Sequence, residues 1–256
     1  ELGGLQLSGH LDGTVLVLGT ASVDGHNLVR SFRMDLAQPD SDLDLEAGFG
    51  GGVLRVRELT LPGAETGELS LEAEHFSLAY FSLLYRSEFR PAGEFSAKAN
   101  LTYPAGRMAE GTGHVQLEML RPMIADLQAD RLLIKGDFQA RKLRVETLDL
   151  VQGSNRVTGS ADLSWGDHPQ AAWKLDLDLP QPASLWTHVG FLRSLKGTVE
   201  GSWESGAVGL SVRQGRLAFT GRVPPVEELS ADLSITAQEL VLHDLSAQIG
   251  RGPMHV

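Results

Sequence analysis

Residues 173–179 read WKLDLDL, with an apolar side chain at every second position. Successive residues of a β-strand point to opposite faces, so the Trp and Leu side chains would line one face and the Lys and Asp side chains the other. Residues 42–49 (DLDLEAGF) and 157–165 (VTGSADLSW) alternate in the same way. This pattern is typical of an antiparallel sheet with one apolar face and one face in water.

Turn residues separate the alternating runs. The chain has 29 Gly among its 256 residues, many of them between short apolar runs. Asp12-Gly13, Asp24-Gly25 and the segments 153–155 (GSN) and 166–169 (GDHP) have turn chemistry, because Gly and Asn tolerate positive φ and Asp caps its own turn. Short strands separated by such turns predict an all-β architecture.

One eight-residue phrase occurs three times, as LRVRELTL at 54–61, LRVETLDL at 143–150 and LVLHDLSA at 240–247. Its apolar residues occupy the first, third, sixth and eighth places, with the small Ala247 last in the third copy. On a helix these places fall at about 0°, 200°, 140° and 340°, on opposite faces. On a strand the alternation slips once, between Val145 and Leu148 in the second copy. A β-bulge, or a sharp corner between two short strands, would return all four side chains to one face, so we predict a bulged or bent strand.

The spacing of the phrases indicates modular construction. Their starts at residues 54, 143 and 240 are 89 and 97 residues apart, which is too irregular for a solenoid with fixed rungs but suits an array of similar β modules. We expect residues 1–256 to be one continuous fragment of a longer repeat-built protein, with approximate modules 1–75, 76–180 and 181–256. The chain begins without Met and ends just after the third phrase, so an anchor or targeting signal is expected outside it.

Three segments depart from strand alternation. The apolar residues of 117–127 have the spacing of one helical face, and Pro122 would open a short helix at its first turn. Residues 182–192 and 76–85 have similarly mixed spacing. We expect short helices or loops that plug an edge of the sheet. For 76–85 (FSLAYFSLLY) the alternative is an amphipathic gate that faces lipid.

Composition excludes several function classes. The formal net charge of −11 argues against a broad nucleic-acid surface or an anionic-membrane patch, since both need excess Lys and Arg. The chain has no Cys, which excludes disulfides, zinc-thiolate sites and Cys nucleophiles. No apolar stretch approaches the ~20 residues of a membrane-spanning helix.

The sequence contains no common catalytic motif. The eight His are scattered, and none has the spacing of a His-x-x-x-His or HExxH metal site. There is no GxSxG elbow and no P-loop, and the Gly-rich run 48–52 precedes a predicted strand rather than a helix. Trp165, Trp173, Trp186 and Trp203 would suit a sugar groove, but Trp165 and Trp173 share strand parity with the apolar set. We expect no enzyme, no cofactor and no metal site.

The repeated segments carry a family resemblance. LRVETLDLVQGSNRVTGSADLSW (143–165), LDLDLPQPASLWTHVGFLRSLKGTVEGSW (175–203) and ADLSITAQELVLHDLSAQIGRGPMHV (231–256) resemble the repeats of the AsmA/TamB-like family of bacterial envelope proteins. The resemblance implies a long, curled antiparallel sheet forming an open apolar groove. It also implies an inner-membrane anchor outside this fragment, a location in the periplasm of a Gram-negative-type bacterium, and transport of phospholipid between inner and outer membranes.

A groove of this kind has a clear physical use. Exposing acyl chain to water costs ~0.8 kcal/mol per CH₂, so two 16-carbon chains would cost roughly 25 kcal/mol. Strands with one apolar face can shield those chains, but the same strands would also build a closed sandwich with a filled core. The residues predicted to line the groove are Leu54, Val56, Leu59, Leu61, Leu143, Val145, Leu148, Leu150, Leu163, Trp165, Leu175, Leu177, Leu210, Val212, Leu217, Phe219, Leu240 and Leu242.

The functional hypothesis is therefore a lipid conduit whose ligand is phospholipid and whose further candidate partners are outer- or inner-membrane proteins. One alternative is a structural or chaperone-like module for outer-membrane protein assembly, which would offer a sheet edge to incoming strands. Another is a β-sandwich that binds carbohydrate. No nucleic acid is expected as a partner.

Overall fold

The computed structural model describes residues 5–23, 26–35, 42–49, 52–59, 65–78, 92–105, 107, 110–124, 127–166, 168–250 and 252–255. The chain divides into two compact units, and each is described by itself. Unit 1 comprises Glu1–Ala125 and Asp137–Arg141, and unit 2 comprises Asp126–Gly136 and Lys142–Val256. The three-module division predicted from the phrases stays a prediction.

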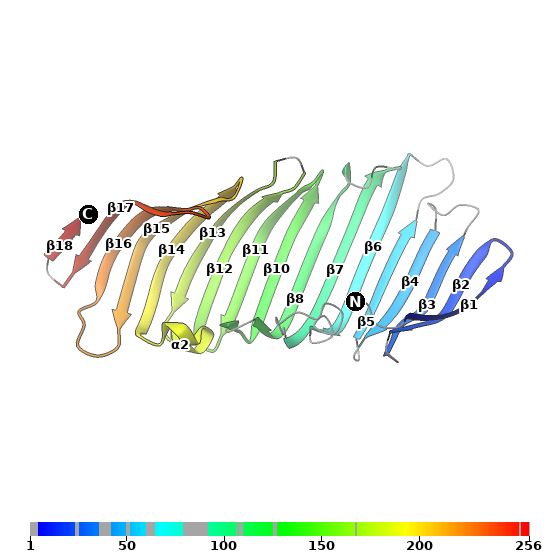
Figure 1. The fold of residues 1–256 in the computed structure, drawn as a ribbon, viewed down its shortest axis with the longest axis horizontal. Coiled ribbons are helices and arrows are strands. Elements are labelled where there is room, and N and C mark those ends of the chain that lie inside the picture. The colour runs from blue at the N-terminus through cyan, green and yellow to red at the C-terminus, as the bar shows by residue number, and fades with distance from the viewer. Residues whose placement is uncertain are drawn as a thin grey trace. The chain divides into compact units, whose positions relative to one another are not determined.

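Unit 1 is a series of antiparallel strands in which each strand pairs with the next one along the chain (Figure 1). The predicted turn at Asp12-Gly13 joins the first two strands, and Gly13 has a φ of 61°. The strands are β1 (Leu5–Asp12), β2 (Val15–Val23), β3 (His26–Asp35), β4 (Asp42–Phe49), β5 (Gly52–Leu59), β6 (Thr66–Ser77), β7 (Ala92–Pro104) and β8 (Thr112–Ile124).

Unit 2 repeats this plan from β11 to β18, again with consecutive antiparallel pairing. Its elements are β9 (Leu127–Gln128), β11 (Lys142–Gln152), β12 (Asn155–Ser164), β13 (Gln170–Leu179), α2 (Pro182–Leu185), η2 (Thr187–Val189), β14 (Leu192–Glu204), β15 (Ala207–Phe219), β16 (Val226–Ile235), β17 (Leu240–Ile249) and β18 (Gly252–His255). One further strand, β10 (Arg131–Gln139), begins in unit 2, and its residues from Asp137 belong to unit 1.

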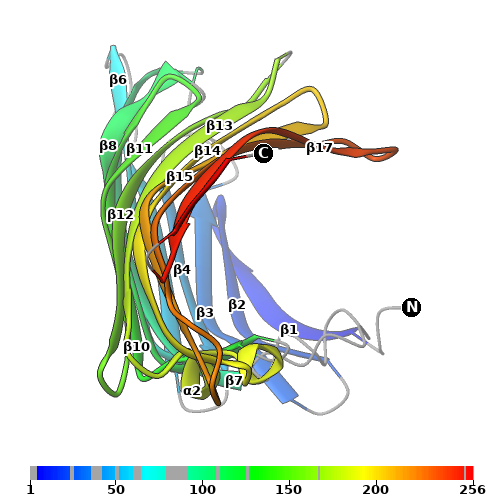
Figure 2. The same ribbon diagram turned by 90° about the vertical axis from the view of Figure 1, so that its left-hand side faces the viewer.

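The predicted fold class, an all-β curled antiparallel sheet that is open on one side, is confirmed. Figure 2 shows β11 to β15 bowing along their length toward one side, so the sheet of unit 2 has a concave and a convex face. Short helices were predicted in 182–192, and α2 and η2 occupy this segment. In the other mixed segment, Phe76 and Ser77 belong to β6, and residues 79–85 lie outside the described part of the chain.

The bulge predicted in the second phrase is confirmed. The register of β11 against β12 slips between Val145 and Leu148. The four apolar residues of the phrase therefore share one face, where they pair with Leu163, Ala161, Gly159 and Val157. The third phrase behaves in the same way, because the register of β17 against β16 slips at His243 and leaves Leu242 and Leu245 on one face.

The bulge predicted in the first phrase is wrong. β5 pairs in regular register with both β4 and β6 up to its last residue, Leu59. Leu59 stands opposite Glu68, so it falls in a polar row and not in the apolar set. The strand ends at Leu59, inside the phrase, so no bulge is needed to bring its last apolar residues onto the face of Leu54 and Val56. Leu61, also predicted to line the groove, lies outside the described residues.

The helix predicted within 117–127 is also wrong, because 112–124 forms strand β8. β8 pairs with β7 as far as Met123, and the register slips between Leu120 and Met123. Arg121 lies in this bulge with a φ of 50°. The predicted helical face mixes the two faces of this strand, because Leu117 lies opposite Ala97 whereas Leu120 lies opposite Glu94 and is 40% exposed.

Non-Gly residues with positive φ mark the bulges that bend the strands. His75, Arg121, Gln214 and Glu228 have φ values of 50°, 50°, 53° and 52°, and each lies within a register slip. The left-handed conformation brings Cβ close to the following carbonyl and costs roughly 1–2 kcal/mol for an L-residue. The extra residue increases the local bend and twist of the strand. The bulges thus account for part of the curl.

Replacing Gln214 with Gly is expected to raise the free energy of unfolding by about 0.5–1 kcal/mol. Gly has no Cβ to strain at positive φ, and this gain exceeds the extra entropy that Gly has in the unfolded chain. Urea denaturation measures the change. The matched control is Ala218→Gly in the same strand, where φ is not positive; it should destabilise the chain by about as much. A stability loss in both variants would contradict the bulge assignment.

Candidate functional site

The apolar face of unit 2 continues without interruption from β11 to β17. Residues that stand directly opposite one another on neighbouring strands form rows across the sheet. The central row is Leu148, Gly159, Leu175, Val199, Val212, Ala231 and Leu245. The next row is Val145, Ala161, Trp173, Gly201, Leu210, Leu233 and Leu242. A third row is Leu143, Leu163, Ala171, Trp203, Val208, Ile235 and Leu240. These rows contain no charged or hydrogen-bonding side chain except the Trp indoles.

This face is the concave one. Leu185 of α2 is buried with Leu179 and Ala129, and Leu177 and Leu195 of the sheet pack against this cluster. The helix therefore covers one end of the apolar face. Figure 2 shows α2 inside the curl of the sheet, so the apolar rows line the inside of the curl.

Most of the apolar face is not covered. Leu175, Val199 and most other members of the rows are half-buried, and Leu240 is 66% exposed. A closed sandwich would bury these side chains against a second layer. Within the described residues of unit 2, α2 covers one end of the face, and Val145 and Ala231 are the members of the three rows that are buried. The rows therefore form an open trough rather than a filled core.

Small residues make room for the largest side chain of the trough. A Cβ at Gly201 would lie 2.2 Å from Cε2 of Trp173, so the indole lies across this Gly on the neighbouring strand. The large ring consequently lies on the sheet surface, which keeps the trough open. This placement agrees with the prediction that Trp173 packs with the apolar set.

A buried polar residue fixes α2 to the concave face. Asn155 is 1% exposed. Its Nδ2 donates to the backbone oxygen of Gln181 at 2.8 Å and to Oγ of Ser184 at 2.8 Å, and its Oδ1 accepts from the backbone N–H of Gln181 at 2.8 Å. The sequence predicts a turn at Asn155, but it contains no local signal for these contacts with Gln181 and Ser184.

The convex face is polar. Cross-strand ion pairs cover it, with Nζ of Lys174 2.8 Å from Glu200 and a guanidinium nitrogen of Arg213 2.8 Å from Asp232. Such pairs explain the carboxylates that alternate with the apolar residues. Among the described residues, no cluster of three His, Asp or Glu has the geometry to hold a metal ion.

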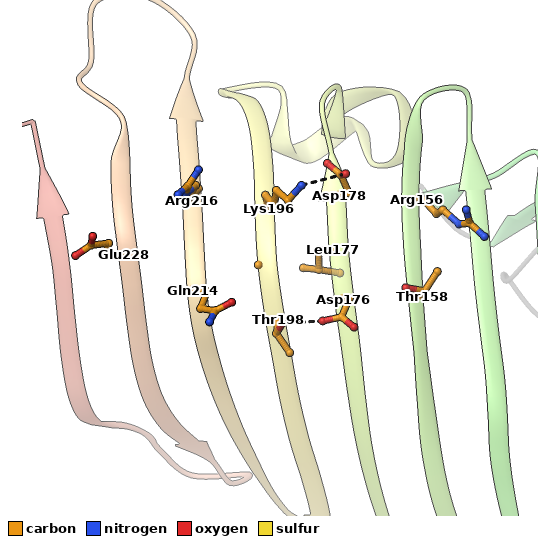
Figure 3. A pocket seen from close by; sticks show the side chains of 11 residues that line it. Arg156, Thr158, Asp176, Leu177, Asp178, Lys196, Thr198, Gln214, Arg216 and Glu228 are labelled. Carbon is orange, nitrogen blue, oxygen red and sulfur yellow. Dashed lines mark hydrogen bonds and ion pairs between the residues drawn. The ribbon is translucent and has the colours of Figure 1, made fainter.

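A shallow hollow of about 800 Å³ lies on this polar face (Figure 3). Nζ of Lys196 lies 3.3 Å from Asp178, and the Thr198 hydroxyl donates to Asp176 at 2.6 Å. Since these groups are already paired and open to solvent, the hollow is best explained as part of the solvated outer face. The lining residues are Arg156, Thr158, Asp176, Leu177, Asp178, Lys196, Gly197, Thr198, Gln214, Arg216 and Glu228.

Asp149 forms the most buried ion pair described on the polar face. Its carboxylate accepts from Nε of Arg156 at 2.8 Å and from Arg131 at 3.0 Å. The hydrogen bond from Arg156 is the main cause of a lowered pKa of Asp149; burial opposes the shift and Arg131 adds to it. The pKa of Arg156 is raised by the same contact.

The stability of the chain is expected to fall in acid partly because of Asp149. Its folded-state pKa lies below the unfolded value of about 3.9, so its contribution is present above pH ~4 and is lost as the pH falls through the folded pKa. Asp149→Asn should lower stability at neutral pH and flatten the loss of stability below pH ~4. Urea midpoints over this range measure both effects. Asp162→Asn, at an exposed position on β12, is the control; an unchanged acid slope in Asp149→Asn would contradict the assignment.

Unit 1 has apolar rows of the same kind across β5 to β8. One row is Val56, Leu71, Ala99 and Val115, and its neighbour is Leu54, Ala73, Ala97 and Leu117. The next row is interrupted by Glu58, which pairs with Leu69. Its carboxylate accepts a hydrogen bond from the hydroxyl of Tyr103, a buried residue of β7. Glu58 is thus a polar residue on the apolar face of β5 to β8. The sequence prediction did not include it.

Most of the predicted lining residues fall on the apolar face of their own unit. Trp165 directly follows β12 and is exposed. Val199, Trp203 and Leu233 complete the same rows but were not among the predicted lining residues. The predicted residues that the register places on the apolar faces are Leu54, Val56, Leu143, Val145, Leu148, Leu150, Leu163, Leu175, Leu177, Leu210, Val212, Leu217, Phe219, Leu240 and Leu242.

Within the described part of the chain, no helix has the length and apolar character needed to cross a membrane. The chain matches no family model, no curated protein and no solved structure.

Proposed function

We propose that the chain is a segment of a non-enzymatic phospholipid conduit. In this function the apolar concave face shields acyl chains, and the headgroup remains in water at the open side of the curl. The observation that carries the proposal is the set of uncharged rows from β11 to β17, most of whose side chains are half-buried instead of covered.

The dimensions of the face suit acyl chains. Neighbouring strands lie ~4.8 Å apart, so the six spacings from β11 to β17 span about 29 Å. The hydrocarbon region of one bilayer leaflet is about 15 Å thick, half of the ~30 Å core. Acyl chains therefore fit within the rows of unit 2. Each CH₂ group that moves from water onto this face gains up to ~0.8 kcal/mol.

The resemblance of the repeated segments to AsmA/TamB-like proteins supports the same function. In this proposal the conduit lies in the periplasm, is anchored to the inner membrane and carries phospholipid between the two membranes. The uncovered rows favour a groove over a filled sandwich. No observation on the described residues favours carbohydrate binding or barrel-protein assembly over lipid.

Site-specific photocrosslinking tests the proposal. A benzophenone amino acid at Leu175 would face the trough, and the same probe at Lys174 on the same strand would face the polar side. Irradiation in bacteria followed by mass spectrometry should give phospholipid adducts at position 175 and none at 174. Native mass spectrometry of the purified chain, with lipid extraction, should find the same lipids.

Other results would overturn the proposal. Protein without lipid in native mass spectrometry, together with no lipid adduct at 175, would exclude a conduit. Adducts to outer-membrane barrel proteins at 175 would instead support an assembly function. Binding of the chain to a glycan array, with lipid absent, would support the carbohydrate alternative.

A further inference from the structure

One end of unit 2 exposes large apolar side chains outside the trough. Trp186, Phe191 and Val223 are 49%, 58% and 56% exposed. Trp186 and Phe191 flank η2, and Val223 lies in the loop between β15 and β16. Figure 1 shows α2 and the β15–β16 loop at the same end of the strands.

These side chains are held in place by local contacts. The backbone N–H of Thr220 donates to the backbone oxygen of Phe191 at 3.0 Å, and the Thr220 hydroxyl donates to the same oxygen at 3.2 Å. The two loops are therefore joined. The ring of Trp186 meets that of His188 edge to face, with centroids 6.3 Å apart, and Asn155 fixes the preceding turn.

The two segments that carry these side chains differ in composition from the rest of the chain, although the exposed Glu227 and Glu228 directly follow the second one. The chain has 33 Asp and Glu residues and a net charge of −11, yet the segments 179–199 and 213–226 contain neither Asp nor Glu. Arg193 and Arg222 lie in these segments, next to the exposed apolar residues in the sequence. Within the described residues, neither Arg has a carboxylate partner. The other cations of the two segments include Lys196 and Arg213, which pair with carboxylates on the convex face.

Exposed aromatic and aliphatic side chains beside unpaired Arg form the pattern of a membrane-interface contact. Trp is favoured at the headgroup level of a bilayer, and Arg binds phosphate through a planar set of donors. The negative charge elsewhere on the chain is screened beyond about 8 Å at physiological ionic strength, so the local charge decides the contact. The net charge of −11 argued against an anionic-membrane patch, but this value is a sum over the whole chain and does not describe the charge near Trp186 and Phe191.

We propose that the α2-end patch, formed by Trp186, Phe191, Val223, Arg193 and Arg222, docks unit 2 on the surface of an anionic phospholipid bilayer. The three apolar side chains enter the headgroup region, and the two guanidinium groups contact lipid phosphates. This inference goes beyond the conduit and does not require it, because a chain can dock on a membrane without shielding acyl chains in its trough.

Vesicle flotation of the whole chain tests the inference. The chain should float with vesicles of mixed phosphatidylcholine and phosphatidylglycerol and much less with phosphatidylcholine alone. Arg193→Gln with Arg222→Gln should reduce binding to the mixed vesicles roughly tenfold or more, since each basic residue near an anionic surface contributes measurably. Trp186→Ser with Phe191→Ser should reduce binding by at least as much, and both double variants should unfold at the wild-type urea concentration.

Trp165→Ser is the matched control, because Trp165 is similarly exposed, at 45%, but follows β12 at the opposite strand end, near Asp162 and Glu204. Its binding should equal that of the wild type. No flotation of the wild-type chain, or an equal loss in Trp165→Ser, would overturn the inference. Native mass spectrometry separately measures the lipid retained in the trough. Retained lipid without flotation would overturn docking alone, and flotation without retained lipid would overturn the conduit alone.

Discussion

Replacing Leu175 with Arg is expected to remove bound phospholipid from the chain and leave it folded. Leu175 is half-buried at the centre of the apolar rows of unit 2. In an open trough the Arg stem can lie on the sheet while its guanidinium reaches water. An acyl chain would then have to desolvate the charge, at a cost of about 3 kcal/mol by comparison with membrane interiors. Lipid affinity should therefore fall roughly 100-fold.

The measurements are phospholipid content by native mass spectrometry and stability by urea denaturation. Ala172→Arg is the matched control, because Ala172 is an exposed residue on the polar face of the same strand. It should retain both lipid and stability. If the rows formed a filled core, Leu175→Arg would bury an unpaired charge and cost about 3–5 kcal/mol or more. Unfolding together with lipid loss would therefore refute the open trough.

Replacing Asn155 with Leu is expected to destabilise the chain by about 3 kcal/mol. Leu has the same branched arrangement of side-chain heavy atoms and is larger than Asn, so a cavity is not the cause. The substitution removes three hydrogen bonds and leaves the backbone N–H of Gln181 without its partner, although the Gln181 oxygen still accepts from the N–H and hydroxyl of Ser184. A net hydrogen bond contributes about 1 kcal/mol, and a buried unsatisfied group costs about 1–3 kcal/mol. The segment that carries α2 should then detach from the concave face.

Urea denaturation and amide hydrogen exchange at Gln181 measure these effects. Ser154→Ala, in the same turn but exposed, is the control and should change stability by less than about 0.5 kcal/mol. Wild-type exchange at Gln181 in Asn155→Leu would contradict the anchoring role. Detachment of α2 should also expose Leu179 and increase binding of a hydrophobic dye.

The strands of this fold were largely predictable because their faces differ chemically. WKLDLDL forms a regular strand, and the slip between Val145 and Leu148 was visible because four apolar side chains had to reach one face. The same reasoning failed for 54–61, because the phrase does not specify where a strand ends. β5 ends at Leu59, inside the phrase. In 117–127 the helical spacing came from apolar residues on both faces of one strand, Leu117 on the apolar face and the exposed Leu120 opposite Glu94.

The candidate site was predictable only in part. Alternation identified the residues of the apolar face but left open whether a second layer covers it, since a trough and a filled core require the same pattern. The rows also depend on register. Leu195 lies opposite Leu217 only because β15 has one extra residue between Arg213 and Arg216, which no local spacing reveals. Asn155 and Gln181 are 26 residues apart, and their contact depends on the path of the chain between them.

The consecutive pairing of strands also determines how unit 2 comes apart. Every strand from β11 to β18 is hydrogen-bonded to its neighbours along the chain, with no strand inserted from elsewhere. Under tension an outer hairpin can peel away while the pairs behind it remain intact, as in repeat proteins whose units contact only their neighbours. Each lost strand shortens every row by one residue and leaves the remainder continuous. Partial unfolding therefore shortens the apolar face of unit 2, while the strands that remain paired keep one apolar and one polar face.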